Sequence, residues 1–117
     1  MNTTLAARSA SAVLAIHGIF ELAALAMLIA PAEFVPEQFQ GASVFWATLS
    51  ATYGLSRLVA AFAIWSLRKW GAILGLALSL TTMVVAPTIE SFGLVDLPLA
   101  VLVMILLAYA WLGSDKL

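Results

Sequence analysis

Residues 9–30 read SASAVLAIHGIFELAALAMLIA, an apolar stretch that ends at Pro31 and contains only two ionisable side chains, His17 and Glu21. At ~1.5 Å of rise per residue, a helix of this length crosses the ~30 Å hydrocarbon core of a bilayer. The stretch is longer than the ~7–15 apolar residues of a cleaved signal peptide. We therefore expect a retained transmembrane helix.

Three further apolar stretches follow the first one. They cover residues 42–67, 71–89 and 97–113, and their boundaries are marked by the basic pair Arg68-Lys69, by Pro98 and by Gly113. Inside lipid, only helices and closed barrels satisfy all of their own backbone hydrogen bonds. Because the connections are short, the sequence predicts an all-α fold in one domain, an integral membrane up-down four-helix bundle over residues 1–117.

The composition also indicates a membrane protein. Hydrophobic residues make up 64% of the chain and charged residues 9%, whereas soluble domains carry about 25% charged residues. The formal net charge of -1 argues against a nucleic-acid partner, because such a partner requires a basic face. The chain has no cysteine and one histidine, so we expect no metal site and no cofactor.

The charges that flank the four stretches alternate in sign along the chain. The bases lie before the first stretch, between the second and third, and after the fourth: Arg8, Arg68, Lys69 and Lys116. The acids lie in the two other connections: Glu33, Glu37, Glu90 and Asp96. Cytoplasmic connections are enriched in Lys and Arg, so we expect both termini in the cytoplasm of a prokaryotic cell. We interpret Glu90 and Asp96 as solvated acids at the outer interface.

One base, Arg57, lies inside the second stretch instead of beside it. Counted at ~1.5 Å per residue from the inner boundary, Arg57 lies ~17 Å deep, between His17 at ~14 Å and Glu21 at ~20 Å. His17 and Glu21 are spaced i, i+4 and share one helix face, as Tyr53 and Arg57 do. The sequence predicts an ion pair between Glu21 and Arg57 that faces the bundle interior, with His17 and Tyr53 beside it.

Thr81 and Thr82 lie at a comparable depth in the third stretch and are expected to supply further hydrogen bonds. Charges at such a depth are costly and mark ligand or proton sites by default. A buried ion pair can instead fix the register of two helices without any ligand. Both interpretations, a structural lock or a site for ligand binding or proton handling, stay open for five candidates: His17, Glu21, Tyr53, Arg57 and Thr81.

Small residues are spaced for close helix packing in the third stretch, where Gly71, Gly75 and Ser79 stand four residues apart. They form either a dimer seam or a contact within the monomer. We favour the contact within the monomer, because a four-helix membrane bundle needs close approaches in any case. Gly54 and Gly18 are expected to let two helices approach each other beside the charged residues.

The pattern His17-Gly18-x-x-Glu21, followed by Tyr53-Gly54-x-x-Arg57 and by Trp70-Gly71, resembles small prokaryotic four-helix membrane proteins of the broadly DoxX-like group. This resemblance implies a four-helix bundle. DoxX itself is associated with membrane redox enzymes, and no residue here carries that role over.

The chain is also similar to the small multidrug resistance transporters in its length, its four apolar stretches and the acid in the first one. Glu21 takes the place of their proton- and drug-binding acid in this comparison. However, Arg57 is expected to neutralise that acid, and the third stretch lacks their motif rich in glycine and aromatic residues. Cation export is therefore disfavoured.

No residue spacing in the chain is typical of nucleophilic catalysis. The sequence predicts a non-enzymatic membrane protein, either an accessory or assembly subunit or a lipid-binding module, built around the Glu-Arg-His cluster. The alternative is a small homodimeric carrier, a proton-coupled transporter or ligand-binding protein that uses the same cluster. The expected partners are membrane lipid and either a second copy of the chain or a larger membrane complex.

Overall fold

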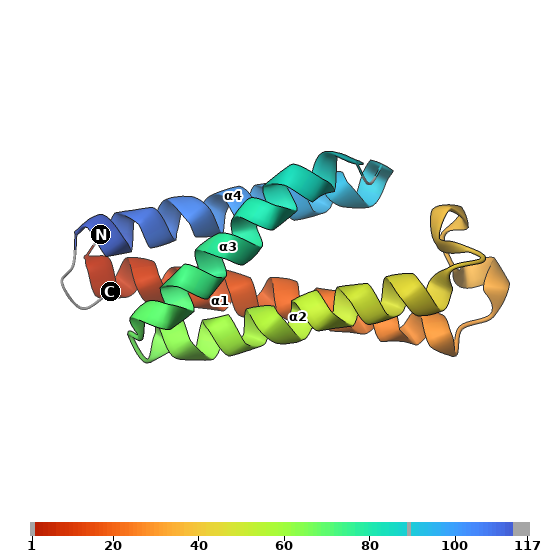
Figure 1. The fold of residues 1–117 in the computed structure, drawn as a ribbon, viewed down its shortest axis with the longest axis horizontal. Coiled ribbons are helices and arrows are strands. Elements are labelled where there is room, and N and C mark those ends of the chain that lie inside the picture. Colours follow the sequence, from red (N-terminus) through yellow and green to blue (C-terminus); the bar gives the residue numbers. More distant parts are fainter. Residues whose placement is uncertain (1, 89, 114–117) are drawn as a thin grey trace.

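The computed structural model describes the backbone of residues 2–88 and 90–113, and the side chains of these residues apart from 90–95. The predicted cytoplasmic Lys116 and the side chain of Glu90 lie outside the described residues. The predicted all-α fold is confirmed, because four helices pack into a bundle (Figure 1). The helices are α1 (Thr3–Leu22), α2 (Ser43–Trp65), α3 (Lys69–Val85) and α4 (Glu90–Leu112).

Short 3-10 helices extend or join these four helices. η1 (Ala23–Leu28) continues α1, and η4 (Ala86–Thr88) follows α3. η2 (Ala32–Phe34) and η3 (Glu37–Phe39) shape the connection between α1 and α2. Within this connection the Gln40 amide donates to two backbone carbonyls. The connection is therefore a structured segment at one end of the α1–α2 pair.

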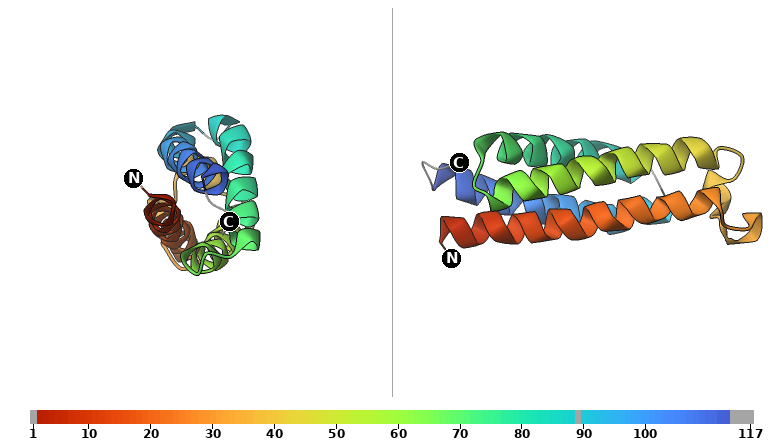
Figure 2. Two further views of the ribbon diagram at one scale, coloured as in Figure 1. Left: turned by 90° about the vertical axis from the view of Figure 1, so that its left-hand side faces the viewer. Right: turned by 90° about the horizontal axis from the view of Figure 1, so that it is seen from below.

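Successive helices run in opposite directions, and α4 returns to pack against α1 (Figure 1 and Figure 2). α1 and α2 lie side by side over most of their length, whereas α3 leaves the end of α2 and crosses toward α4 (Figure 1). The beginning of α1 meets the end of α4, because Thr3 lies against Gly113. α2 and α3 diverge toward the end of the bundle opposite the chain termini (Figure 1).

Two helices begin earlier than the sequence predicts. α1 begins at Thr3 rather than near residue 9, because Asn2 caps it by accepting a hydrogen bond from Leu5 N at 2.7 Å. α4 begins at Glu90, and Pro98, expected at the start of the fourth span, lies inside this helix. A proline fixes φ at about -65° both in the first turn of a helix and inside it. The sequence alone therefore does not show which of these two positions Pro98 occupies.

Three of the described helical segments are long and apolar enough to cross a membrane. They are Thr3–Leu28, Ser43–Trp65 and Lys69–Thr88, and the described apolar part of α4, Asp96–Leu112, is shorter. Large hydrophobic side chains face outward on these segments, among them Ile19, Phe62 and Val84 with 59%, 75% and 68% exposure. Such long apolar helices with outward hydrophobic side chains indicate a multi-pass membrane protein.

The closely packed core lies toward the end of the bundle that holds the chain termini. It consists mostly of alanines with a few larger aliphatic side chains, which lets the helices approach closely. Its buried members are Ala6, Ala7, Ala10, Leu14, Ala60, Ala61, Ile64, Ala72, Val103, Leu107 and Ala110. These residues come from all four helices, so this half of the bundle is filled by side chains.

The small residues of α3 face this core. Gly71, Gly75 and Ser79 are all buried. A Cβ added to Gly71 would lie 2.5 Å from Ala63 Cβ, and one added to Gly75 would lie 2.9 Å from Leu107 Cδ1. The three residues are therefore buried within the monomer, where the two glycines allow α2, α3 and α4 to approach closely.

The turn between α2 and α3 is a Schellman motif. Leu67 has a φ of 58°, Arg68 N donates to Ala63 O, and Leu67 N donates to Ile64 O, both at 2.8 Å. Leu67 adopts the left-handed conformation that glycine more often takes, and its side chain packs against the core. The short basic connection thereby forms a tight antiparallel hairpin.

Candidate functional site

Two glycines bring α1 and α2 together at the level of the predicted charged residues. A Cβ added to Gly18 would lie 2.7 Å from Gly54 O, and one added to Gly54 would lie 2.6 Å from Gly18 O. A side chain at either position would have to displace backbone, so the helix crossing depends on both glycines. Glu21 and Arg57 each follow one of these glycines by three residues, and this spacing directs both toward the same side of the crossing.

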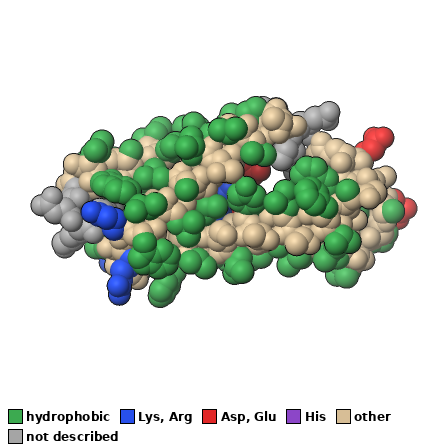
Figure 3. Space-filling model, viewed as in Figure 1, with side chains coloured by type: hydrophobic (Ala, Val, Ile, Leu, Met, Phe, Trp, Pro, Cys, Tyr) green, Lys and Arg blue, Asp and Glu red, His purple; other side chains and the backbone are tan. Residues whose placement is uncertain are grey.

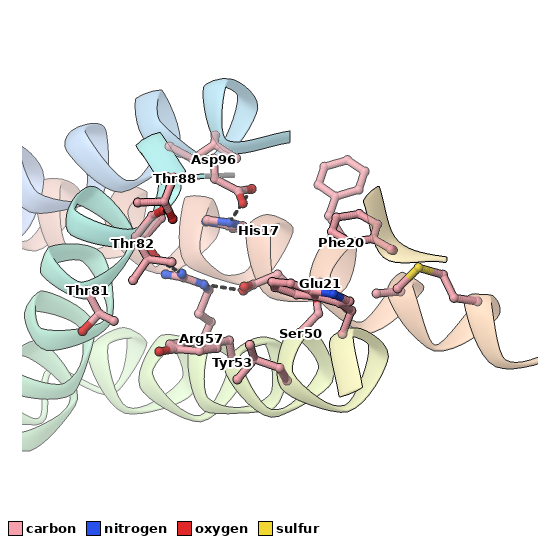
Figure 4. A pocket seen from close by; sticks show the side chains of 18 of the residues that line it. His17, Phe20, Glu21, Ser50, Tyr53, Arg57, Thr81, Thr82, Thr88 and Asp96 are labelled. Carbon is pink, nitrogen blue, oxygen red and sulfur yellow. Dashed lines mark hydrogen bonds and ion pairs between the residues drawn. The ribbon is translucent and has the colours of Figure 1, made fainter. Parts of the chain in front are cut away.

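The predicted ion pair between Glu21 and Arg57 is confirmed (Figure 4). Arg57 Nε donates to Glu21 Oε1, and Arg57 Nη2 donates to Oγ1 of Thr82 on α3. The side chain of Arg57 is 1% exposed and that of Glu21 is 14% exposed. Ser50 Oγ also donates to the backbone carbonyl of Glu21 at 2.9 Å. These bonds join α1, α2 and α3 inside the bundle.

His17 pairs with an acid from the fourth helix. His17 Nε2 lies 3.1 Å from Asp96 Oδ1, with side-chain exposures of 2% and 36%. The interpretation of Asp96 as a solvated interfacial acid is therefore wrong. Because α4 already begins at Glu90, Asp96 lies within a helix that packs against α1 rather than in the outer connection. The sequence reasoning missed Asp96 because it placed the helix start beyond this residue.

The candidates Tyr53 and Thr81 line the site but make no hydrogen bond to its charged side chains in the described part of the chain. Thr81 Oγ1 donates to the Ala77 carbonyl at 2.8 Å, and the neighbouring Thr82 accepts from Arg57. Successive residues of a helix point about 100° apart, so the rotation of α3 decides which threonine reaches the guanidinium. Tyr53 is half-buried in the wall of a cavity.

This cavity, of about 730 Å³, adjoins the charged cluster formed by His17, Glu21, Arg57 and Asp96. Figure 3 shows a hollow in one face of the molecule, with acidic and basic side-chain atoms at its bottom and hydrophobic side chains around it. The walls are mostly apolar and aromatic and reach the α1–α2 connection: Phe20, Met27, Pro36, Phe39, Phe45, Trp46, Leu49 and Leu99. The cavity thus has an apolar wall and a charged floor.

Several polar atoms of this region are buried without a partner. Arg57 Nη1, His17 Nδ1 and Ser79 Oγ have no hydrogen bond within the described residues. Each unsatisfied buried polar group costs about 1–3 kcal/mol, and most buried polar groups in folded proteins are satisfied. Arg57 Nη1 and His17 Nδ1 belong to the charged cluster, whereas Ser79 lies among the small residues of α3 that face the core.

The charged side chains of the cluster pair with one another. No three His, Cys, Asp or Glu side chains gather as metal ligands in the described residues. His17 is held by Asp96, and Glu21 is held by Arg57. The arrangement can therefore bind the polar end of a ligand by hydrogen bonds and charge, while the walls contact its apolar part.

No family model, no curated protein and no solved structure matches this chain. The resemblance to DoxX-like proteins stays a prediction. The structure establishes an all-α protein of four helices, with three helical segments among the described residues that are long and apolar enough to cross a membrane. It also establishes two salt bridges, Glu21–Arg57 and His17–Asp96, beside a cavity.

Proposed function

We propose that all four helices cross the plasma membrane of a prokaryotic cell, with both termini in the cytoplasm. Among the described residues, bases gather at one end of the bundle and loop acids at the other (Figure 3): Arg8, Arg68 and Lys69 against Glu33 and Glu37. Lys and Arg favour the cytoplasmic side, and Trp is enriched at both membrane interfaces. Arg8 lies 5.1 Å from the centre of the Trp65 ring, and Lys69 lies 5.9 Å from that of Trp111. This orientation puts the cavity on the outer side of the charged cluster.

The proposed function is non-enzymatic binding of one amphiphilic molecule, such as a lipid, within the membrane. The observation that carries this proposal is the cavity of about 730 Å³ with apolar walls and a charged floor. Small-molecule sites usually measure about 300–1,000 Å³ and combine mostly apolar walls with a few polar groups. The apolar part of the ligand would contact Phe20, Met27 and Leu49, and its polar end would face Glu21 and Asp96.

The packing favours binding over transport by a carrier. A carrier must open its site to each side of the membrane in turn. Between the cluster and the end with the chain termini, Leu14, Ile64 and Leu107 are fully buried with 0% exposure. Opening that side would require separating this buried core, whereas binding requires access from one side only.

Two adjacent alanines provide matched variants for a test. Ala24 lines the cavity, whereas Ala23 is exposed and does not line it. An indole side chain at residue 24 should project into the cavity and obstruct ligand binding, and one at residue 23 should point away from it. Both variants would be purified into phosphatidylcholine nanodiscs, and their helix content would be checked by circular dichroism.

The probes are dodecylamine, monolaurin and sodium laurate, which share one chain length and differ in the polar end. We expect at least one of them to raise the unfolding temperature of the wild type and of Ala23→Trp, because a ligand that binds the folded state stabilises it. Ala24→Trp should show no such rise. If none of the probes stabilises the wild type, or if Ala24→Trp responds equally, the binding proposal is wrong.

A further inference from the structure

We infer that the cavity selects an amphiphile with a cationic, ammonium-type polar end over one with an anionic end. This inference rests on the binding function proposed above and specifies its ligand. It follows from which charged groups a ligand can reach, from the charge that the floor carries, and from the aromatic composition of the wall.

The acids of the cluster are accessible, and the bases lie behind them. The side chains of Asp96 and Glu21 are 36% and 14% exposed, whereas those of His17 and Arg57 are 2% and 1% exposed. In Figure 4 the Glu21 carboxylate lies between Arg57 and the side of the cavity where Phe20 stands. A ligand that enters the cavity therefore meets carboxylate oxygens before it meets the guanidinium.

The paired bases leave these carboxylates able to accept further hydrogen bonds. Arg57 Nε and His17 Nε2 each reach one oxygen, Oε1 of Glu21 and Oδ1 of Asp96. A carboxylate has two oxygens and about four acceptor positions. An ammonium group carries three donors and no acceptor, so it complements these remaining positions, whereas another carboxylate brings only acceptors.

The charges nearest the ligand lead to the same preference. The accessible charged side chains, Asp96 and Glu21, are both acidic. A cationic group is attracted by them, whereas an anionic group approaches like charges. Inside a membrane protein, where water screens little, a like-charge approach is costly.

Aromatic rings form part of the cavity wall. Phe20, Phe45, Trp46 and Tyr53 all line the cavity, and the rings of Phe45 and Trp46 pack edge to face with their centroids 5.2 Å apart. The faces of aromatic rings attract cations. The wall therefore favours a cationic group on its way to the carboxylates, in addition to the apolar part of the ligand.

The test compares the dissociation constants of dodecylamine, monolaurin and laurate in zwitterionic nanodiscs near neutral pH. Specific binding is defined as the binding signal of Ala23→Trp minus that of Ala24→Trp. We expect dodecylamine to bind at least about tenfold more tightly than laurate, with monolaurin between them. Asp96→Asn should reduce this preference, whereas Glu33→Gln, which removes an acid outside the cavity, should keep it.

The inference would be overturned if laurate or monolaurin bound as tightly as dodecylamine or more tightly. It would also be overturned if Asp96→Asn kept the same preference for dodecylamine as the chain with Asp96. These outcomes leave the proposed binding function standing. If none of the three probes binds specifically, the binding function itself fails, so the two failures are distinguishable.

Discussion

Gly18 and Gly54 each lie against the backbone carbonyl of the other, and each precedes one partner of the Glu21–Arg57 ion pair by three residues. The close approach of the two helices and the buried ion pair are therefore parts of one contact. Because the helices meet without intervening side chains, the carboxylate and the guanidinium can reach each other inside the bundle.

Adding a methyl group at this crossing should destabilise the protein. Alanine favours the helix more than glycine does, yet in Gly18→Ala and Gly54→Ala the nearest atom to the new Cβ is a backbone oxygen at 2.7 and 2.6 Å. We expect each change to lower the free energy of unfolding by about 1–3 kcal/mol, the usual range for overpacking. The measurement is unfolding in mixed detergent micelles, followed by circular dichroism.

Gly113→Ala is the matched control for these glycine variants. Its added Cβ would come closest to the Thr3 methyl, at the end of a small side chain near the chain termini. This control should have a much smaller effect than the two variants at the crossing. Equal effects at all three glycines would show that the crossing of α1 and α2 is not special.

The ion pair should appear as strong coupling in a double-mutant cycle. Glu21→Gln leaves the buried guanidinium without its acid, and Arg57→Gln leaves the carboxylate without its base, so each should cost about 3 kcal/mol or more. The double variant should cost clearly less than the sum of the two single changes. Glu33→Gln, at an exposed acid, serves as the control. Additive single effects would contradict a direct interaction.

Replacing Thr82 by valine should destabilise the protein much more than replacing the adjacent Thr81 by valine. Thr82 is buried and accepts a bond from Arg57, whereas the bond of Thr81 among the described residues goes to the carbonyl one turn before it. Thr82→Val should lower the free energy of unfolding by about 1–3 kcal/mol, because a buried charged donor loses its acceptor. Thr81→Val should change it by less than about 0.5 kcal/mol. The reverse order would show that α3 is rotated differently.

The membrane orientation can be tested with single cysteines, since the natural chain has none. Gln38→Cys and Ser66→Cys place a thiol at exposed positions near opposite ends of the bundle. With cytoplasmic termini, a membrane-impermeant maleimide should label residue 38 in intact cells and residue 66 only after permeabilisation. The opposite pattern would contradict the proposed orientation.

The helix count and the ion pair could be predicted from the sequence because both depend on local signals. Apolar stretches bounded by prolines and bases predict the number of helices and give the ends of α2 and α3 to within a few residues. Charged side chains at one depth in lipid are expected to pair with each other. The i, i+4 and i, i+3 spacings also fix the faces of α1 and α2. For these reasons Glu21 could be matched to Arg57 without coordinates.

Two contacts could not be predicted in the same way. One is the pairing of His17 with Asp96, and the other is the bond from Arg57 to Thr82 instead of Thr81. Asp96 stands two residues before Pro98, where the sequence gives no sign that the helix has already begun. Thr81 and Thr82 are equivalent in chemistry and depth, and only the rotation of α3 separates them. The cavity likewise depends on the divergence of α2 and α3, which is a property of tertiary packing.

The most direct test of the binding site is native mass spectrometry of the protein after gentle extraction from its membrane. The wild type and Ala23→Trp should retain one amphiphilic molecule per chain, and Ala24→Trp should be recovered without it. Equal retention of the molecule by both tryptophan variants, or a wild-type chain without any bound amphiphile, would contradict a ligand site in the cavity beside the Glu21–Arg57 pair.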